Sequence, residues 1–303
     1  MSSGSKKVII AALLGNALIS ITKFTAAIFT GSSAMLSEGI HSLVDTGNQI
    51  LLLYGMKQAE KPADEKFPFG YGKEIYFWSF IVAILIFALG GGASVYQGVQ
   101  HVLHPVEIVD PLINYIVLGF ALLFEGAAWY FALREFKRSK GKWGYIEGVK
   151  RAKDPSVFVV LFEDSAAMLG LMVAFLGIYL TQLTGILYLD GLASVIIGFI
   201  LIGTAIWLAY ETKGLLIGES ANQPVVQGIK LILQTNINIE VVNEVLTMHM
   251  GPNFILANIS VDFKDDLSAE NLENCIANID REIKLKYPLV QRVFIEAERA
   301  HQK

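Results

Sequence analysis

Six long apolar blocks constrain the fold of this chain more than any other feature of its sequence. They cover residues 8–30, 34–56, 76–99, 111–133, 155–180 and 189–210. A helix rises 1.5 Å per residue, so blocks of roughly twenty residues or more are long enough to cross the hydrocarbon core of a bilayer. The 303 residues are 53% hydrophobic and only 17% charged, which is too apolar for an ordinary soluble domain. We therefore predict an all-α transmembrane region of six helices.

The positive charges predict how these helices are oriented. Lysines and arginines gather before the first block, between the second and third blocks, and between the fourth and fifth. The three opposite loops, 31–33, 100–110 and 181–188, contain neither residue type. By the positive-inside rule, we expect a multi-pass membrane protein with both termini in the cytoplasm, in the cell or inner membrane if the source is prokaryotic. The basic segment 134–153 is interpreted as facing lipid headgroups, and no nucleic-acid partner is expected.

Residues 213–303 have the pattern of a small α+β domain. A helical apolar pattern over 223–235 precedes two segments of alternating apolar residues, 244–250 and 255–263, which flank a Gly-Pro-Asn turn. Ser268 is the expected N-cap of a second helix, and residues 290–296 are a last expected strand. The order α-β-β-α-β predicts a ferredoxin-like fold. We therefore divide the chain into a six-helix transmembrane domain, 1–212, and a cytoplasmic ferredoxin-like domain, 213–303.

The second and fifth blocks carry ionisable side chains where a membrane helix tolerates few. His41 and Asp45 are four residues apart, so they lie on one face of a helix, at a spacing that gives a metal ion two ligands. Glu163 and Asp164 are adjacent carboxylates, whose mutual repulsion requires a proton or a cation nearby. These four residues are our predicted metal site. Imidazole and carboxylate ligands suit zinc and its first-row neighbours.

Other ionisable residues are weaker candidates. Lys23 in the first block and Glu125 in the fourth each need a partner at bilayer depth, and we expect them to serve in proton or charge coupling. Lys23 is the candidate counter-ion of Glu125. In the C-terminal domain, His249, Glu296 and Glu298 are candidates for a secondary metal site.

Taken together, these features resemble the cation diffusion facilitator family over essentially the whole chain. The resemblance rests on the six blocks, the His-x-x-x-Asp pattern of His41 and Asp45, Asp164, the FGYGK segment at 69–73 and the HMGP segment at 249–252. The residues at 41–49 are most similar to the branch that includes zinc transporter nine.

The resemblance implies a homodimeric transporter without a prosthetic group. It would export Zn²⁺, or alternatively Fe²⁺, Co²⁺, Ni²⁺ or Mn²⁺, from the cytoplasm in exchange for H⁺. Alternating access would act on an ion held between the second and fifth helices, and the C-terminal domain would support dimerisation. The family also uses a lysine at the position of Lys73 to lock the protomers together, for which Glu219 is the candidate acidic partner.

The sequence departs from this family at several ligand positions. Val160 stands where the fifth helix usually carries a second ligand, so that either Glu163 or water completes the site. Histidines of the C-terminal metal site are replaced, which favours a domain that stabilises a dimer over one that senses metal. The replacing residues are Asn243, Ser260, Glu273 and Glu296.

Two other functions remain open from the residues alone. A membrane-embedded metal-dependent hydrolase would also place histidine and carboxylates on helices, but it needs a third strong ligand and an open water position. A passive divalent-cation channel would need no proton coupling. We expect a transporter rather than an enzyme.

Overall fold

The computed structural model describes residues 3–300, apart from the side chains of residues 3–12, 14, 15 and 139. Two compact units make up the chain. The helical unit comprises Met1–Met56 and Phe77–Thr212, and the second unit comprises Lys57–Tyr76 and Lys213–Lys303. Lys6 and Lys7, two of the charges that predict the orientation, lie outside the described side chains.

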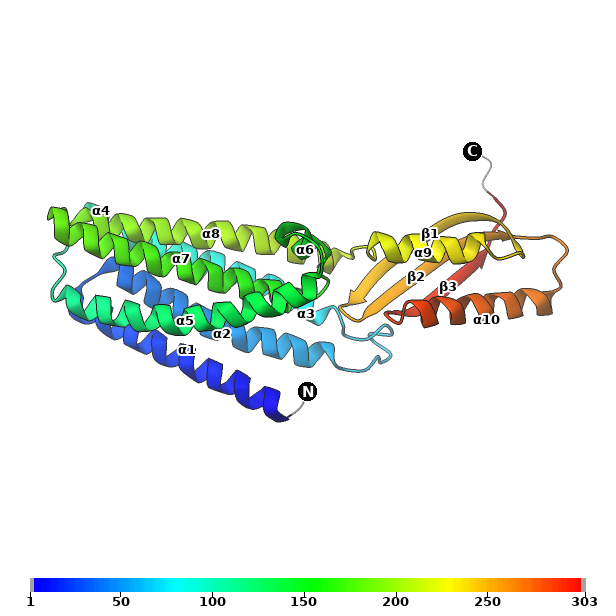
Figure 1. Cartoon of the computed structure of the whole chain (residues 1–303), viewed down its shortest axis with the longest axis horizontal. Coiled ribbons are helices and arrows are strands. Elements are labelled where there is room, and N and C mark those ends of the chain that lie inside the picture. Colours follow the sequence, from blue (N-terminus) through cyan, green and yellow to red (C-terminus); the bar gives the residue numbers. More distant parts are fainter. Residues whose placement is uncertain (1–2, 301–303) are drawn as a thin grey trace. The chain divides into compact units, whose positions relative to one another are not determined.

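Long helices form over the six predicted blocks (Figure 1). A short helix, α6 (Tyr145–Arg151), joins α5 to α7 and was not predicted. The long helices are α1 (Ser3–Thr30), α2 (Ser33–Ala59), α5 (Pro111–Lys140), α7 (Pro155–Thr184), α8 (Tyr188–Ile217), and a continuous rod made of α3 (Glu74–Leu85), the π-helical η1 (Ile86–Gly92) and α4 (Ala93–Leu103).

By length and composition, four of these rods are able to cross a membrane: Glu74–Leu103, Pro111–Arg138, Pro155–Thr184 and Tyr188–Ile217. Among the described residues of α1, Asn16–Thr30 is a shorter apolar helix. The helix α2, which carries His41 and Asp45, is not one of the four because its polar residues interrupt the apolar run. The prediction of a helical membrane region is therefore confirmed at the level of four strongly apolar spans.

Glycines allow α4 and α8 to pack with their backbones in contact. A methyl group on Gly98 would lie 2.6 Å from the backbone nitrogen of Val195, and one on Gly191 would lie 2.8 Å from that of Val102. Both distances are far shorter than a carbon atom tolerates, so only glycine permits this approach. The contact fixes α8 against the rod that contains α4.

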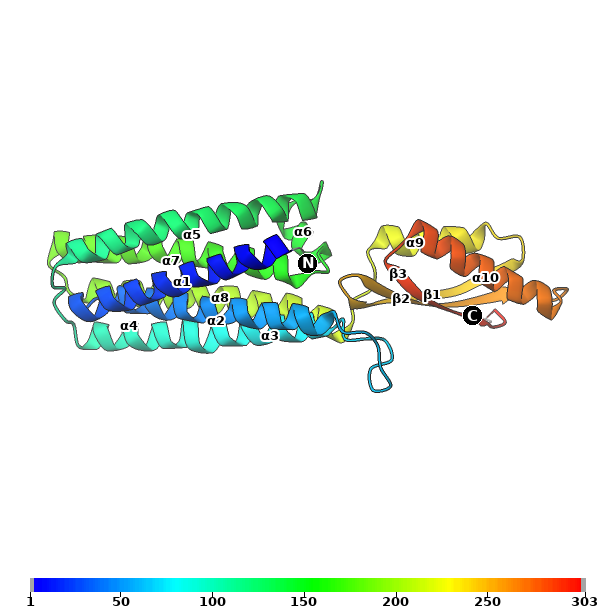
Figure 2. The same ribbon diagram turned by 90° about the horizontal axis from the view of Figure 1, so that it is seen from below.

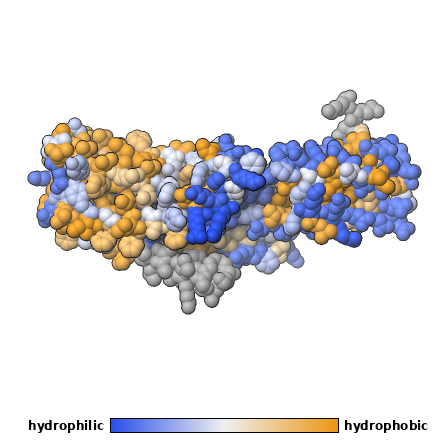
Figure 3. Space-filling model, viewed as in Figure 1, coloured by the Kyte–Doolittle hydropathy of each residue, from blue (hydrophilic) through white to orange (hydrophobic). Residues whose placement is uncertain are grey.

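The helix α5 packs along α7 and α1 (Figure 2). Many of its apolar side chains are left uncovered. Leu112, Phe120 and Leu123 are 68%, 60% and 70% exposed. Figure 3 shows that hydrophobic side chains gather over much of the helical unit, whereas hydrophilic ones predominate on the second unit. An uncovered apolar surface of this extent is what a lipid-facing helix requires.

The second unit is a three-stranded sheet covered on one face by two helices (Figure 2). The antiparallel pair of β1 and β2 is extended by β3, which lies parallel to β2. Ile232, Ile259 and Ile279 are among the buried residues that join both helices to the sheet. The elements are α9 (Gln223–Gln234), β1 (Ile239–Gly251), β2 (Phe254–Phe263), α10 (Ala269–Lys286) and β3 (Val290–Ala297).

The predicted element order of this unit is confirmed, with one clear difference in length. The strand β1 begins at Ile239 rather than at residue 244. Its pairing with β2 is irregular between Ile239 and Val241 and again between Val242 and Glu244. Such irregularities break the alternation of apolar and polar residues, so the sequence pattern is regular only from residue 244 onward.

The segment 57–76 packs against the turn between β1 and β2. A methyl group on Gly72 would lie 2.5 Å from the backbone oxygen of Met250, and one on Gly251 would lie 2.9 Å from the Cα of Gly72. Gly70 has φ +80°, a conformation that favours glycine. The FGYGK and HMGP segments are therefore two sides of one backbone contact.

Candidate functional site

The helices α2 and α7 bring the predicted ligands together inside the helical unit. His41 is 1% exposed, and its Nδ1 lies 3.2 Å from Oδ1 of Asp45, one turn further along α2. Asp45 and Asp164 both line a cavity of about 20 Å³, together with Ser42 and Glu125. That volume holds about one water molecule. The remaining wall of the cavity is formed by Asn16, Ile19, Ala128 and Ala167.

Glu163 joins the same group of side chains from α7. Its Oε1 accepts a hydrogen bond of 2.6 Å from Nδ2 of Asn48 on α2, and its carboxyl group is within hydrogen-bonding reach of that of Asp45. Glu163 is 3% exposed and Asn48 is fully buried. Two buried carboxyl groups in contact require a shared proton or a nearby cation, because like charges repel strongly in a medium of low dielectric constant.

Several polar atoms of this group have no hydrogen-bond partner. The buried atoms without a partner are both ring nitrogens of His41, Oδ1 of Asp45 and Oδ1 of Asn48. The short distance between His41 and Asp45 therefore does not have the geometry of a hydrogen bond. Among the residues that the structure describes, no three His, Cys, Asp or Glu side chains are already arranged around one ion position. The donor atoms suit a divalent cation but would have to converge to bind it.

An ion network adjoins the cavity. Nζ of the fully buried Lys23 on α1 lies 2.7 Å from Oε1 of Glu125 on α5, 3.0 Å from Oε2 of Glu38 and 2.8 Å from Oγ of Ser42, both on α2. The sequence identified Lys23 and Glu125 as candidate partners, and the structure pairs them. Glu38, which is also fully buried, is a third member that the sequence analysis did not identify.

The position of Glu38 follows from the turn between α1 and α2. Lys23 lies eight residues before Gly31 and Glu38 lies five residues after Ser33, so in an antiparallel helix pair the two occur at similar heights. This relation is a signal in the sequence that would have identified the pair. Glu38 also contacts α7, because a methyl group on Gly170 would collide with its Oε1.

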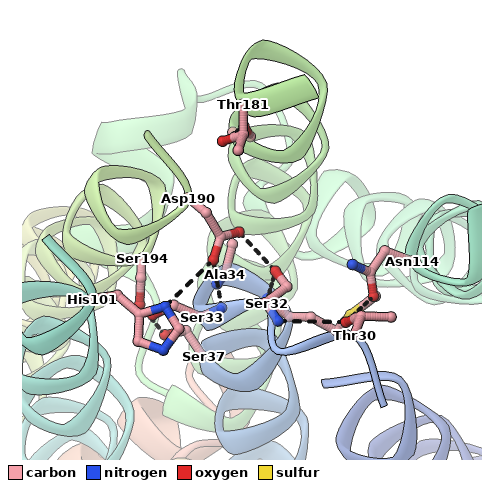
Figure 4. A network of polar contacts seen from close by, with 12 residues as sticks. Thr30, Ser32, Ser33, Ala34, Ser37, His101, Asn114, Thr181, Asp190 and Ser194 are labelled. Carbon is pink, nitrogen blue, oxygen red and sulfur yellow. Dashed lines mark hydrogen bonds and ion pairs between the residues drawn. The ribbon is translucent and has the colours of Figure 1, made fainter. Parts of the chain in front are cut away.

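A second polar network holds the first turn of α2 in place (Figure 4). Asp190, at the start of α8, accepts hydrogen bonds from Oγ of Ser32 at 2.7 Å and from the backbone nitrogens of Ser33 and Ala34 at 2.5 and 3.3 Å. Nδ1 of His101 on α4 is 3.9 Å away. Asp190 lies in the first turn of its own helix, where a negative charge is favourable. The structure shows that it caps α2, the helix that carries His41 and Asp45.

The candidates for a secondary metal site are not all together. On β2, Ile255 pairs with His249, whereas Ser260 pairs with Glu296. Five residues along a strand correspond to roughly 17 Å, so His249 is far from Glu296. Glu298 accepts a hydrogen bond of 2.8 Å from Oγ of Ser260 and lies at the same end as Glu296. A single site built from all three residues is therefore not formed in the described part of the chain.

Lys73 and Glu219, the candidates for an interlock, both lie near the end of β1 within the second unit. Nζ of Lys73 lies 3.8 Å from the sulfur of Met248. The carboxyl group of Glu219 packs against Gly214, and its backbone oxygen accepts a hydrogen bond from the backbone nitrogen of His249 at 2.9 Å.

Known proteins share sequence similarity with most of this chain. Residues 9–217 match the family model described as Cation efflux transmembrane domain. The Xenopus laevis protein named Proton-coupled zinc antiporter SLC30A9, mitochondrial, is 36% identical over 262 residues, which cover 86% of this chain and 47% of that protein. The human protein of the same name is 35% identical over 86% of this chain and 46% of its own length. The chain thus spans about half the length of these two relatives.

A bacterial relative matches over nearly its full length. The Manganese efflux system protein MneP of Bacillus subtilis is 22% identical over 297 residues, which cover 96% of this chain and 95% of that protein. These relatives are named as transporters and not as enzymes, in agreement with the function expected from the sequence. The match to the family model covers more than half of the chain and includes every residue of the predicted site in the helical unit. The chain therefore belongs to the cation efflux family, the cation diffusion facilitators expected from its sequence.

Proposed function

We propose that this protein exports a divalent metal cation, with zinc as the preferred cargo, in exchange for protons. The observation that carries the proposal is the group of ionisable residues between α2 and α7, where His41 and Asp45 lie beside Glu163 and Asp164 in a buried environment. In the proposed complex His41, Asp45 and Asp164 bind the ion, and Glu163 supplies the ligand that is missing at Val160. Water is the competing fourth ligand.

Zinc is preferred on chemical grounds and from the names of two relatives. One imidazole and several carboxylates form a ligand set typical of tetrahedral Zn²⁺, although Fe²⁺, Co²⁺, Ni²⁺ and Mn²⁺ accept similar ligands. The two relatives at 35–36% identity are named as zinc antiporters, whereas the bacterial relative at 22% is named for manganese. Flux measurements with each metal decide between these cargoes.

Proton exchange follows from the same ligands. Carboxylate and imidazole groups bind a metal ion in their deprotonated forms, so binding releases protons and ion release takes them up. In alternating access, the empty site returns across the membrane with protons in place of the metal ion. The relatives' name Proton-coupled zinc antiporter agrees with this coupling.

The membrane topology completes the proposal. We propose six spans, in which α1 and α2 join the four strongly apolar rods because the polar side chains of α2 face the interior of the helical unit. The distribution of lysine and arginine supports cytoplasmic termini. Residues 1–212 then form the transport domain, and residues 213–303 form a cytoplasmic domain of ferredoxin-like fold.

The C-terminal domain is proposed to form the homodimer. Its helices cover one face of the sheet, and the opposite face exposes Leu246 and Phe294 at 52% and 47%. Both residues pair with Asn258 of the central strand, so they flank it on the same face. An apolar pair on an uncovered sheet suits contact with a second copy of the chain.

A flux assay in proteoliposomes tests the transport site. Metal uptake is measured for Zn²⁺, Mn²⁺, Fe²⁺, Co²⁺ and Ni²⁺ with and without an imposed pH gradient. Asp45→Ala and Asp164→Ala are expected to abolish uptake, and Glu163→Gln reduces it if Glu163 is the fourth ligand. Glu135→Gln is the control, because this carboxylate is 65% exposed and is not among the residues that line the cavity.

Each outcome has a distinct meaning. Full transport by Asp45→Ala and Asp164→Ala would exclude the proposed site. Full transport by Glu163→Gln alone indicates that water completes the ligand shell. Uptake that does not respond to a pH gradient would indicate a passive channel in place of an antiporter.

A further inference from the structure

The ion network beside the cavity contains a fixed positive charge. Lys23 is fully buried, and its Nζ is surrounded by Oε1 of Glu125, Oε2 of Glu38 and Oγ of Ser42 at 2.7 to 3.0 Å. One lysine faces two carboxylates, so the formal charge of the three ionisable side chains is −1. A buried ammonium group is stable only while such partners remain in contact with it.

Glu125 belongs to both the network and the cavity. Its Oε1 pairs with Lys23, while its Oε2 is buried without a hydrogen-bond partner. The same side chain lines the cavity with Asp45 and Asp164, as does Ser42, which binds Lys23. Glu125 is therefore a carboxylate within reach of two cations, the ammonium group of Lys23 and a metal ion in the cavity.

An independent observation is that unsatisfied polar atoms lie on and next to the cavity wall, at Asp45 and at its neighbour His41. His41 is 1% exposed, both of its ring nitrogens lack a hydrogen bond, and it lies 3.2 Å from Asp45 of the cavity wall. A buried imidazole whose nitrogens make no hydrogen bond destabilises the folded protein unless a ligand binds to it. The acidic residues are thus accompanied by an unsatisfied metal-binding side chain.

We propose that Lys23 is a tethered competitor of the transported cation. In the metal-free protein its ammonium group holds Glu125, and a divalent cation in the cavity takes this carboxylate away from Lys23. Lys23 then lowers the affinity of the site and promotes release of the ion. This inference rests on the proposed transport site, and Lys23 acts in it as a positioning residue because it reaches the ion only through Glu125.

A charge-matched double variant separates this role from a purely structural one. Lys23→Gln with Glu38→Gln removes one positive and one negative charge, so the formal charge of the three side chains stays at −1 while Glu125 loses its competitor. The Kd for Zn²⁺ and Co²⁺ is measured by calorimetry on the full chain in detergent. We expect the Kd to fall by roughly tenfold or more. The carboxylate of Glu125 is then no longer paired with Lys23, so its full negative charge attracts the divalent ion in a medium of low dielectric constant. In proteoliposomes, KM and kcat for zinc flux should both fall, since binding tightens while release slows.

A second variant tests Glu125 directly. Glu125→Gln should raise the Kd by roughly tenfold and change the visible absorption of bound Co²⁺, because a carboxylate that reaches the ion alters its ligand field. A structural ion pair with Lys23 would alter the thermal stability and leave the Co²⁺ spectrum unchanged. Glu135→Gln is the control for loss of one carboxylate.

The outcomes separate the inference from the proposed function. A folded double variant whose Kd, KM and kcat stay within twofold of the parent protein would overturn the role of Lys23. If the double variant does not fold, Glu125→Gln decides alone, and an unchanged Kd and Co²⁺ spectrum overturn the inference. Asp45→Ala is measured in the same assay. If Asp45→Ala binds metal as tightly as the parent protein, the proposed site itself is refuted. If Asp45→Ala loses binding while the double variant and Glu125→Gln have no effect, only the competition by Lys23 is refuted.

Discussion

Removing the carboxylate of Asp190 should loosen the first turn of α2. The first backbone N–H groups of a helix have no partner within the helix, and Asp190 accepts those of Ser33 and Ala34 at 2.5 and 3.3 Å (Figure 4). Asp190 also accepts a hydrogen bond from Oγ of Ser32 at 2.7 Å. Asp190 is 1% exposed, so these donors are shielded from bulk water, and substitution to alanine removes their acceptor.

The size of the effect follows from these contacts. Two of the three hydrogen bonds are short, and a hydrogen bond to a charged group contributes about 1.5 to 3 kcal/mol, so Asp190→Ala should cost about 3 to 6 kcal/mol. Asp190→Asn keeps the shape and one acceptor. It should cost about 1 to 2 kcal/mol, mainly through the lost charge at a helix N-terminus.

Thermal unfolding of the purified chain in detergent measures both variants. For a unit of this size, about 1 kcal/mol shifts the Tm by roughly 2 to 4 °C, so Asp190→Ala should lower the Tm by roughly 6 to 24 °C. Asp110→Asn is the matched control, because Asp110 precedes α5 without a side-chain hydrogen bond to that helix. A Tm for Asp190→Ala within 2 °C of the parent protein, or an equal loss from Asp110→Asn, would refute the capping role.

Three further predictions follow from other contacts. Gly98→Ala should destabilise the helical unit by about 1 to 3 kcal/mol, because its methyl group would overlap the α8 backbone. Gly119→Ala, with open space around it, should stabilise the unit by up to about 1 kcal/mol. Equal Tm values for the two variants would contradict this prediction. The hydrogen bond from Tyr71 lowers the pKa of Asp64, so its contribution to stability is present above the ordinary aspartate pKa and is lost as the pH falls through the lowered value. Tyr71→Phe should raise that pKa toward its ordinary value in a carboxylate NMR titration, and an unchanged pKa would assign the shift elsewhere. Phe294→Asp should convert a dimer to a monomer in light scattering, and a persistent dimer would exclude the exposed sheet face as the interface.

Much of the architecture is predictable from local patterns. Apolar length identifies the six long helices, and the alternation in residues 255–263 identifies β2, because each helix or strand requires its own periodicity to bury one face. The caps are equally local. Ser268, the expected N-cap, accepts a hydrogen bond from the backbone nitrogen of Asn271, and Asp154 accepts one from that of Ser156. The start of β1 is not predictable, because its irregular pairing with β2 interrupts the alternation.

The candidate site divides in the same way. The sequence by itself identifies His41 and Asp45 as neighbours on one helical face, and it identifies Lys23 and Glu125 as charges that need partners, since an ion in an apolar helix is costly wherever that helix packs. Only the tertiary structure decides that Glu38 shares Lys23 with Glu125 and that Asp190 caps α2 from α8. Spacing along one chain fixes which side chains share a helical face, whereas the rotation and packing of separate helices fix which faces meet. The rotation and packing of the helices depend on contacts between residues that are far apart in the sequence.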